Sequence, residues 1–148
     1  MTVNPELVGR EFPAVGPYLV GREKVREFAR AVFATNPLFT DLEAARAAGH
    51  ADVVAPPTFP VVIQEHTLSQ LLSEPDANID FSRVVHGDQR FTYSRPVVAG
   101  DELTATLSVT SVKTLGAHSM VTSESVMTDS TGAHVVTATS TLVVRGGE

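Results

Sequence analysis

Cysteine is absent from this chain of 148 residues. Its absence excludes disulfide bonds, thiolate metal sites and a cysteine nucleophile. Basic residues are also few: 11 Lys and Arg stand against 17 Asp and Glu, which gives a formal net charge of −6. Nucleic acid and anionic membrane surfaces are therefore not expected as main partners, because phosphate binding needs clustered Lys and Arg.

Long apolar runs are missing as well. No stretch approaches the roughly 18 apolar residues that span a bilayer, and no basic segment followed by an apolar run opens the chain, so no secretion signal is expected. Phosphate-binding glycine loops and metal-ligand His spacings are also absent, so we expect no cofactor and no metal. The composition, 43% hydrophobic and 19% charged, predicts one cytoplasmic globular domain over residues 1–148.

The first half of the chain has helical periodicity. Apolar residues recur at helical spacing after Arg22 and predict a helix that ends at Asn36, because a residue before proline avoids the α region. Residues 59–72 contain the longest apolar stretch with this spacing. We expect them to form a central helix in the core, with Pro60 in its first turn.

A second, shorter helix is expected between these two. Thr40 and Glu43 have the spacing of a capping box, in which each side chain bonds the exposed amide of the other residue. An alanine-rich segment follows, and Gly49 is a suitable left-handed residue to end it.

After about residue 80, polar and apolar residues alternate. Residues 103–109 show a period of two, which is typical of a half-buried strand. Residues 87–93, 117–128 and 133–145 are further strand candidates, and Asp-Ser-Thr-Gly at 129–132 predicts a hairpin turn. The second half is therefore expected to be a run of antiparallel strands.

This order of elements predicts an α+β fold. A single hotdog domain, in which an antiparallel sheet of about five strands wraps around one long central helix, satisfies it most simply. Such a sheet leaves an edge strand uncovered, so a dimer is expected. A ferredoxin-like fold is the alternative, but it requires strands interleaved between helices.

Four segments carry a resemblance to MaoC-like (R)-specific enoyl hydratases. They are Thr-Asn-Pro-Leu-Phe-Thr-Asp at 35–41, Ala-Ala-Arg-Ala-Ala-Gly-His at 44–50, Val-Ala-Pro-Pro-Thr at 54–58 and Arg-Pro-Val-Val-Ala-Gly-Asp-Glu-Leu at 95–103. The resemblance spans about residues 5–145. It implies a hotdog fold and chemistry on acyl chains held as thioesters of CoA or acyl-carrier protein.

The chain departs from that family at the positions of its chemistry. The family's catalytic Asp falls at Ala34 and its catalytic His at Phe39. Hydration of an enoyl thioester needs groups that activate water and handle a proton, and neither side chain can do so. The loop that supplies an oxyanion-binding amide in the family contains Pro56 and Pro57, which have no N–H to donate.

With these substitutions the chain resembles the non-catalytic A subunits of actinobacterial (3R)-hydroxyacyl-ACP dehydratases. The segment Val-His-Gly-Asp-Gln-Arg-Phe at 85–91 is also similar to the corresponding strand of those subunits. The resemblance implies a second hotdog subunit that carries the Asp and His, while this chain accommodates the acyl group. The expected binding residues lie in the motif segments, and they are Asn36, Pro37, Phe39, Ala55, Pro56, Pro57 and Thr58. Asn36-Pro37 has a purely local interpretation as a helix terminator.

Two other functions stay open from the sequence. One is a self-sufficient hydratase or thioesterase that uses Glu65, His66 or His86. Glu65 and His66 are neighbours on the predicted helix, so only one of them can point inward, and His86 is expected to share a strand face with Asp88. The other is a homodimer that binds acyl-CoA without chemistry.

Overall fold

A computed structural model describes residues 2–147 of the chain. One antiparallel sheet has the strand order β1-β3-β4-β5-β2, with β1 at Val15–Leu19, β2 at Val84–Tyr93, β3 at Glu102–Leu115, β4 at His118–Thr128 and β5 at His134–Val144. The α-helices are α1 (Arg22–Ala31), α2 (Leu42–Ala47) and α3 (Val61–Leu72). Short 3₁₀ turns are η1 (Pro5–Leu7), η2 (Pro37–Phe39), η3 (Pro75–Ala77) and η4 (Phe81–Arg83).

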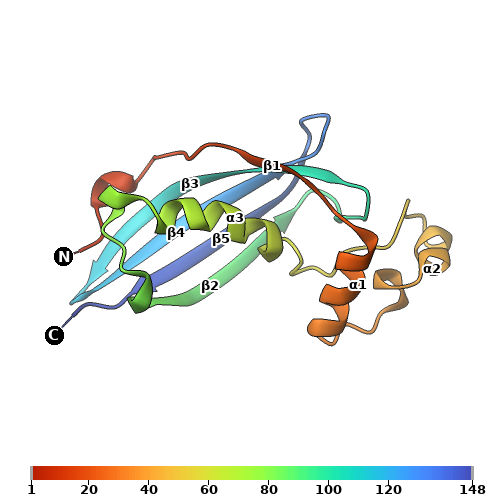
Figure 1. Cartoon of the computed structure of the whole chain (residues 1–148), viewed down its shortest axis with the longest axis horizontal. Coiled ribbons are helices and arrows are strands. Elements are labelled where there is room, and N and C mark those ends of the chain that lie inside the picture. The colour runs from red at the N-terminus through yellow and green to blue at the C-terminus, as the bar shows by residue number, and fades with distance from the viewer. Residues whose placement is uncertain (1, 148) are drawn as a thin grey trace.

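Helix α3 lies along one face of the sheet, as Figure 1 shows, with α1 and α2 grouped beyond one end and both chain termini at the other. α3 packs chiefly against β3 and β1. The predicted α+β architecture, a five-stranded antiparallel sheet around a central helix, is therefore confirmed and is a hotdog fold.

The alternation predicted for the second half of the chain places one face of the sheet in the core. On β3, Leu103, Ala105 and Leu107 are fully buried, while the intervening threonines are half-buried on the other face. The predicted turn between β4 and β5 is present, and Gly132 adopts a φ of +85° there, which glycine reaches without strain.

The face of α3 that meets the sheet is only partly apolar. Gln64 and Thr67 are both fully buried together with the apolar residues of that face. The Thr67 hydroxyl lies 2.7 Å from the Ser125 hydroxyl on β4, and the Gln64 amide is paired with the amide of Gln89 on β2. These partners satisfy polar groups that would otherwise be costly to bury.

The first helix is shorter than its periodicity predicts. α1 ends at Ala31, and Phe33 adopts a left-handed conformation with φ of +57°, so the helix stops before the Asn36-Pro37 pair. The Asn36 side chain instead caps the next turn, where it accepts a hydrogen bond of 3.0 Å from the Leu38 amide.

Two further local predictions are wrong. The cap of α2 is Asp41 and not Thr40, because the Asp41 carboxylate accepts bonds from the amides of Glu43 and Ala44. The prediction that the first half of the chain contains only helices is also wrong, because β1 lies in that half. It is a short edge strand containing Gly16-Pro17, and its pairing with β3 is a long-range interaction without a local signal.

A bulge at Gly87 changes the direction of side chains on β2. The register with β5 shifts between His86 and Asp88. The His86 ring reaches the hydroxyl of buried Ser140 at 3.3 Å, on the face where Gln89 meets α3. Asp88 adjoins Gln89 and points to the opposite face. The expectation that His86 and Asp88 share a strand face is therefore wrong, because the extra residue of a bulge reverses the alternation.

Candidate functional site

An apolar pocket lies at the end of the sheet near α1 and α2. It has a volume of about 390 Å³. Its walls come from the η2 turn, the loop before α3, and the segment that follows β2. The lining residues are Phe39, Val54, Ala55, Pro57, Tyr93, Ser94, Arg95 and Pro96. Three segments that resemble the hydratase motifs thus meet around one cavity.

Backbone hydrogen bonds hold the loop before α3 between the other two walls. The Val54 amide donates to the Leu38 carbonyl of η2 at 2.8 Å. The Ala55 amide donates to the Val97 carbonyl, also at 2.8 Å. Because the Ala55 amide is engaged in this way and prolines follow it, the loop offers little to polarise a thioester carbonyl.

Tyr93 forms the wall of the pocket at the end of β2. Its hydroxyl donates to the Pro57 carbonyl at 2.6 Å, which ties the strand to the loop before α3. Burial raises the pKa of Tyr93 above its usual range, so the hydroxyl stays protonated as a donor. The centroid of the Tyr93 ring lies 6.5 Å from that of Phe91, which packs against the core and does not line the pocket.

The two positions that the resemblance to hydratases assigns to an acid and a base are Ala34 and Phe39, and neither side chain can act as one. Ala34 lies in the loop after α1, where its amide donates to the Ala29 carbonyl at 2.8 Å. Phe39 is half-buried and lines the pocket. A methyl group and a phenyl ring can exclude water and contact an acyl chain, but they cannot transfer a proton.

Arg95 supports the floor of the pocket through two carboxylates. Its guanidinium bonds Asp101 at 2.8 and 3.1 Å and Asp129 at 3.3 Å. Asp101 also accepts the Val98 amide at 2.9 Å. The Asp101 interaction raises the pKa of Arg95. This network joins the segment after β2 to the β4–β5 turn, and it gives the Arg-Pro and Gly-Asp motif residues a structural role.

Asp129 makes the stability of this region dependent on pH. Hydrogen bonds from Thr131, and then from Arg95 and Ala133, lower the pKa of Asp129 from 3.8 to about 2. Because the folded state binds the proton more weakly, the stabilisation is complete above the ordinary pKa and is lost as the pH falls toward about 2. The unfolding free energies of the native chain and Asp129→Asn should therefore differ most above about pH 5 and converge in acid. Urea titrations across this range measure the gap, and a gap that widens in acid would contradict the assignment.

The expected binding residues do not all reach the cavity. Phe39, Ala55 and Pro57 line it. Asn36 and Pro37 are exposed and form the start of η2, and Thr58 is exposed at the beginning of the turn into α3. Pro56 is buried behind the wall.

Glu65, His66 and His86 lie outside the pocket lining. Glu65 and His66 are both exposed on α3, and the His66 ring packs 6.3 Å from Tyr18 of β1. His86 is near the start of β2, with its Nε2 atom 3.1 Å from the Asp88 carbonyl. The inward-facing polar residues of α3 are Gln64 and Thr67. Sequence reasoning missed both, because isolated polar residues in an apolar helix have no distinctive spacing.

Other lining residues were also not anticipated as a site. Tyr93 is the last residue of β2, and Ser94 and Pro96 lie directly after it. The Arg-Pro motif at 95–96 is the sequence signal that could have indicated this wall. The Ser94 hydroxyl is 2.5 Å from Nδ1 of His134, whose Nε2 atom bonds the Thr137 hydroxyl at 2.7 Å. This chain of bonds fixes the rim of the pocket.

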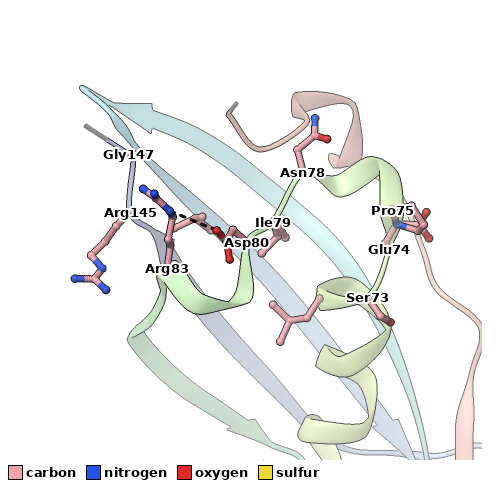
Figure 2. A pocket seen from close by; sticks show the side chains of 11 residues that line it. Ser73, Glu74, Pro75, Asn78, Ile79, Asp80, Arg83, Arg145 and Gly147 are labelled. Atoms are coloured by element: carbon pink, nitrogen blue, oxygen red, sulfur yellow. Dashed lines mark ion pairs between the residues drawn. The ribbon is translucent and has the colours of Figure 1, made fainter.

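A second cavity of about 540 Å³ lies at the opposite end of α3 (Figure 2). Its lining mixes apolar residues such as Leu72 and Ile79 with charged ones, and Asp80 and Arg83 form an ion pair of 3.4 Å within it. Within residues 2–147, no group of three or more His, Asp or Glu could hold a metal ion. None of the helices in this part of the chain is long and apolar enough to cross a membrane.

The fold and the apolar pocket define a hotdog domain of the MaoC-like dehydratase class. Residues 6–138 match the family described as "FAS1-like, dehydratase domain region", and the chain belongs to this family. It is 73% identical to UPF0336 protein Lxx02810 of Leifsonia xyli over 99% of this chain and 98% of that protein. It is 49% identical to a UPF0336 protein of Streptomyces avermitilis over 100% and 99% of the two chains.

Solved structures agree with this assignment. A chain of the C-terminally truncated HadBC (3R)-hydroxyacyl-ACP dehydratase complex from Mycobacterium tuberculosis has a TM-score of 0.83 and 33% identity, covering 93% of this chain and 96% of that one. A MaoC-like dehydratase has a TM-score of 0.88 and 34% identity, covering 95% of this chain but 42% of that one. The chain therefore corresponds to less than half of that longer protein.

Proposed function

We propose that this protein is the non-catalytic, acyl-chain-accommodating subunit of a heteromeric (3R)-hydroxyacyl-thioester dehydratase. The observation that carries the proposal is the pairing of an intact apolar pocket with chemically inert Ala34 and Phe39. A pocket that keeps its walls but lacks an acid and a base is suited to binding an acyl group and not to converting it.

The unpaired edge of β2 offers a place for the second subunit. In the described residues β2 pairs only with β5, so the amides and carbonyls of its outer edge are available to another strand. Val85 on this strand and Phe81 just before it are 47% and 71% exposed, which adds apolar surface there. The similarity to a chain of the HadBC complex supports a partner of hotdog type.

Co-expression tests the proposal. A tagged copy of this chain should co-purify with a hotdog chain from the same genome that carries the Asp and His motif. The complex should hydrate crotonyl-CoA, followed as loss of enoyl-thioester absorbance, whereas this chain alone should not. The reason is that only the partner supplies groups that activate water.

Variants of the complex separate the roles of the two subunits. Replacing the partner's motif His with Ala should abolish turnover, and Glu65→Gln or His66→Ala in this chain should leave it intact. Turnover by this chain alone, lost in Glu65→Gln, would establish the self-sufficient enzyme instead. Binding of acyl-CoA with no hotdog partner recovered would establish the acyl-binding homodimer.

A further inference from the structure

β2 forms an edge of the sheet that is long enough to take a further strand. Seven of its ten residues are exposed, and among residues 2–147 only β5 pairs with it (Figure 1). A long, exposed edge strand is a template for pairing with another chain, because its outer amides and carbonyls have no strand partner.

The opposite edge of the sheet is less suited to such pairing. β1 has five residues, and one of them is Pro17, which has no N–H to donate to a neighbouring strand. Its register with β3 is also irregular. Before β1, the amides of Gly9 and Phe12 donate to carbonyls of β3, so the N-terminal segment covers more of that edge. β2 is therefore the edge that a further strand can reach.

Two opposite charges lie near the middle of β2. Asp88 and Arg90 flank Gln89, whose side chain bonds Gln64 of α3 on the core face, so both charged side chains point to the outer face. Their ion pair within the strand is long, at 3.7 Å, and the side chains are 58% and 71% exposed. An exposed pair of this kind contributes little to stability. Both groups therefore remain available to charges on a docking strand.

A second copy of the chain can present the same strand to this edge. Two identical copies that share one closed interface are related by a two-fold axis. With this axis perpendicular to the sheet, the two β2 strands are antiparallel and the α3 helices of both copies lie on the same face. Side chains directly opposite each other in such a pair also point to the same face. The two sheets can therefore join into one without exposing either core.

The charges of β2 select one register for this pairing. When the strands are centred on Gln89, each Asp88 is opposite the Arg90 of the other copy, and two ion pairs form between the chains. When they are centred on Asp88 or on Arg90, like charges are directly opposite each other, which is destabilising. β2 is thus complementary to itself in the register centred on Gln89.

We propose that a second copy of this chain docks on β2, with the two strands antiparallel about Gln89 and each Asp88 opposite the Arg90 of the other copy. This homodimer forms where the catalytic partner is absent. It uses the edge that the proposed function assigns to that partner, so each chain binds either a second copy or the partner, but not both at once. The homodimer itself requires neither acyl binding nor turnover.

Charge exchange tests this register by sedimentation velocity of the purified chain. The native chain should form a dimer at micromolar concentrations. Asp88→Arg places arginines opposite each other, and Arg90→Asp does the same with aspartates, so each variant should raise the dimer Kd at least about tenfold. The double variant Asp88→Arg/Arg90→Asp restores opposite charges, and its Kd should return to within about threefold of the native value.

A mixture of the two single variants separates contacts between chains from the ion pair within one chain. Asp88→Arg chains carry arginine at both positions and Arg90→Asp chains carry aspartate at both. An equimolar mixture should therefore form a heterodimer with near-native affinity, although neither variant dimerises well alone. Glu27→Arg is the matched control, because it makes the same change of charge as Asp88→Arg at an exposed position of α1 and not on the edge strand. Its dimer Kd should equal that of the native chain.

A native chain that stays monomeric would overturn the inference, as would a dimer whose Kd responds to neither single variant. Weakening that is rescued neither by the double exchange nor by mixing would also overturn it, because the loss would not come from residue 88 facing residue 90. The exchanged side chains are exposed, so the variants should fold, which circular dichroism checks. None of these results decides the proposed subunit role, which depends on co-purification and on the partner's catalytic residues.

Discussion

Phe59→Ala should destabilise the protein by ~3–5 kcal/mol, the cost of deleting a buried phenyl ring. Phe59 is fully buried in the loop before α3, and its ring meets Phe28 of α1 edge-to-face with centroids 5.4 Å apart. It therefore joins the helical end of the molecule to the sheet. Since domains of this size have roughly 5–15 kcal/mol of stability, the variant should be near unfolding, which urea denaturation followed by circular dichroism measures.

Phe33→Ala provides the matched control. Phe33 is also close to α1, but its side chain is 88% exposed. Removing its ring should change the unfolding free energy by less than about 0.5 kcal/mol. If Phe59→Ala and Phe33→Ala lowered the unfolding free energy equally, the buried Phe59 ring would contribute no more to stability than an exposed ring, which contradicts the prediction.

Ser94→Trp should weaken acyl-CoA binding at least tenfold, an effect of about 1.4 kcal/mol. Ser94 is exposed at the rim of the apolar pocket. An indole at this position would fill the space beside Phe39 and Tyr93 without entering the core. Fluorescence or calorimetric titration of the purified chain measures the change in Kd.

Ser94→Ala distinguishes filling of the pocket from loss of a hydrogen bond. Both substitutions remove the bond between the Ser94 hydroxyl and His134, but only tryptophan adds bulk. The alanine variant should retain native affinity within about threefold. Equal affinity of Ser94→Trp and the native chain would show that the acyl group binds elsewhere.

Strong periodicity explains which elements could be predicted from the sequence. The alternation in β3 and the long apolar segment of α3 each place many buried side chains on one face of the element. Such a pattern is compatible with only one type of secondary structure, so both elements could be predicted. β1 has no comparable signal, because a short edge strand with Gly16-Pro17 depends on its pairing with β3. The early end of α1 likewise depends on Phe33, whose left-handed conformation no local rule favours.

The site was predictable only where a motif could be compared with a family. The segments around Phe39 and Ala55 do line the pocket, whereas the wall formed by Tyr93 and Ser94 comes from the end of β2, far away in the sequence. The orientation of His86 depends on the bulge at Gly87, which one sequence does not reveal. Such features arise from tertiary packing and strand register, not from local composition.

The position of β5 in the chain also affects when β2 can fold during synthesis. β2 has β5 as its neighbour in the sheet, and β5 ends only at Val144. During synthesis, residues of β2 therefore leave the ribosome well before the strand that holds them in place. The edge of β2 becomes a structured surface only after β5 has been synthesised, so a subunit that docks there, as proposed, must bind a chain that already extends through Val144.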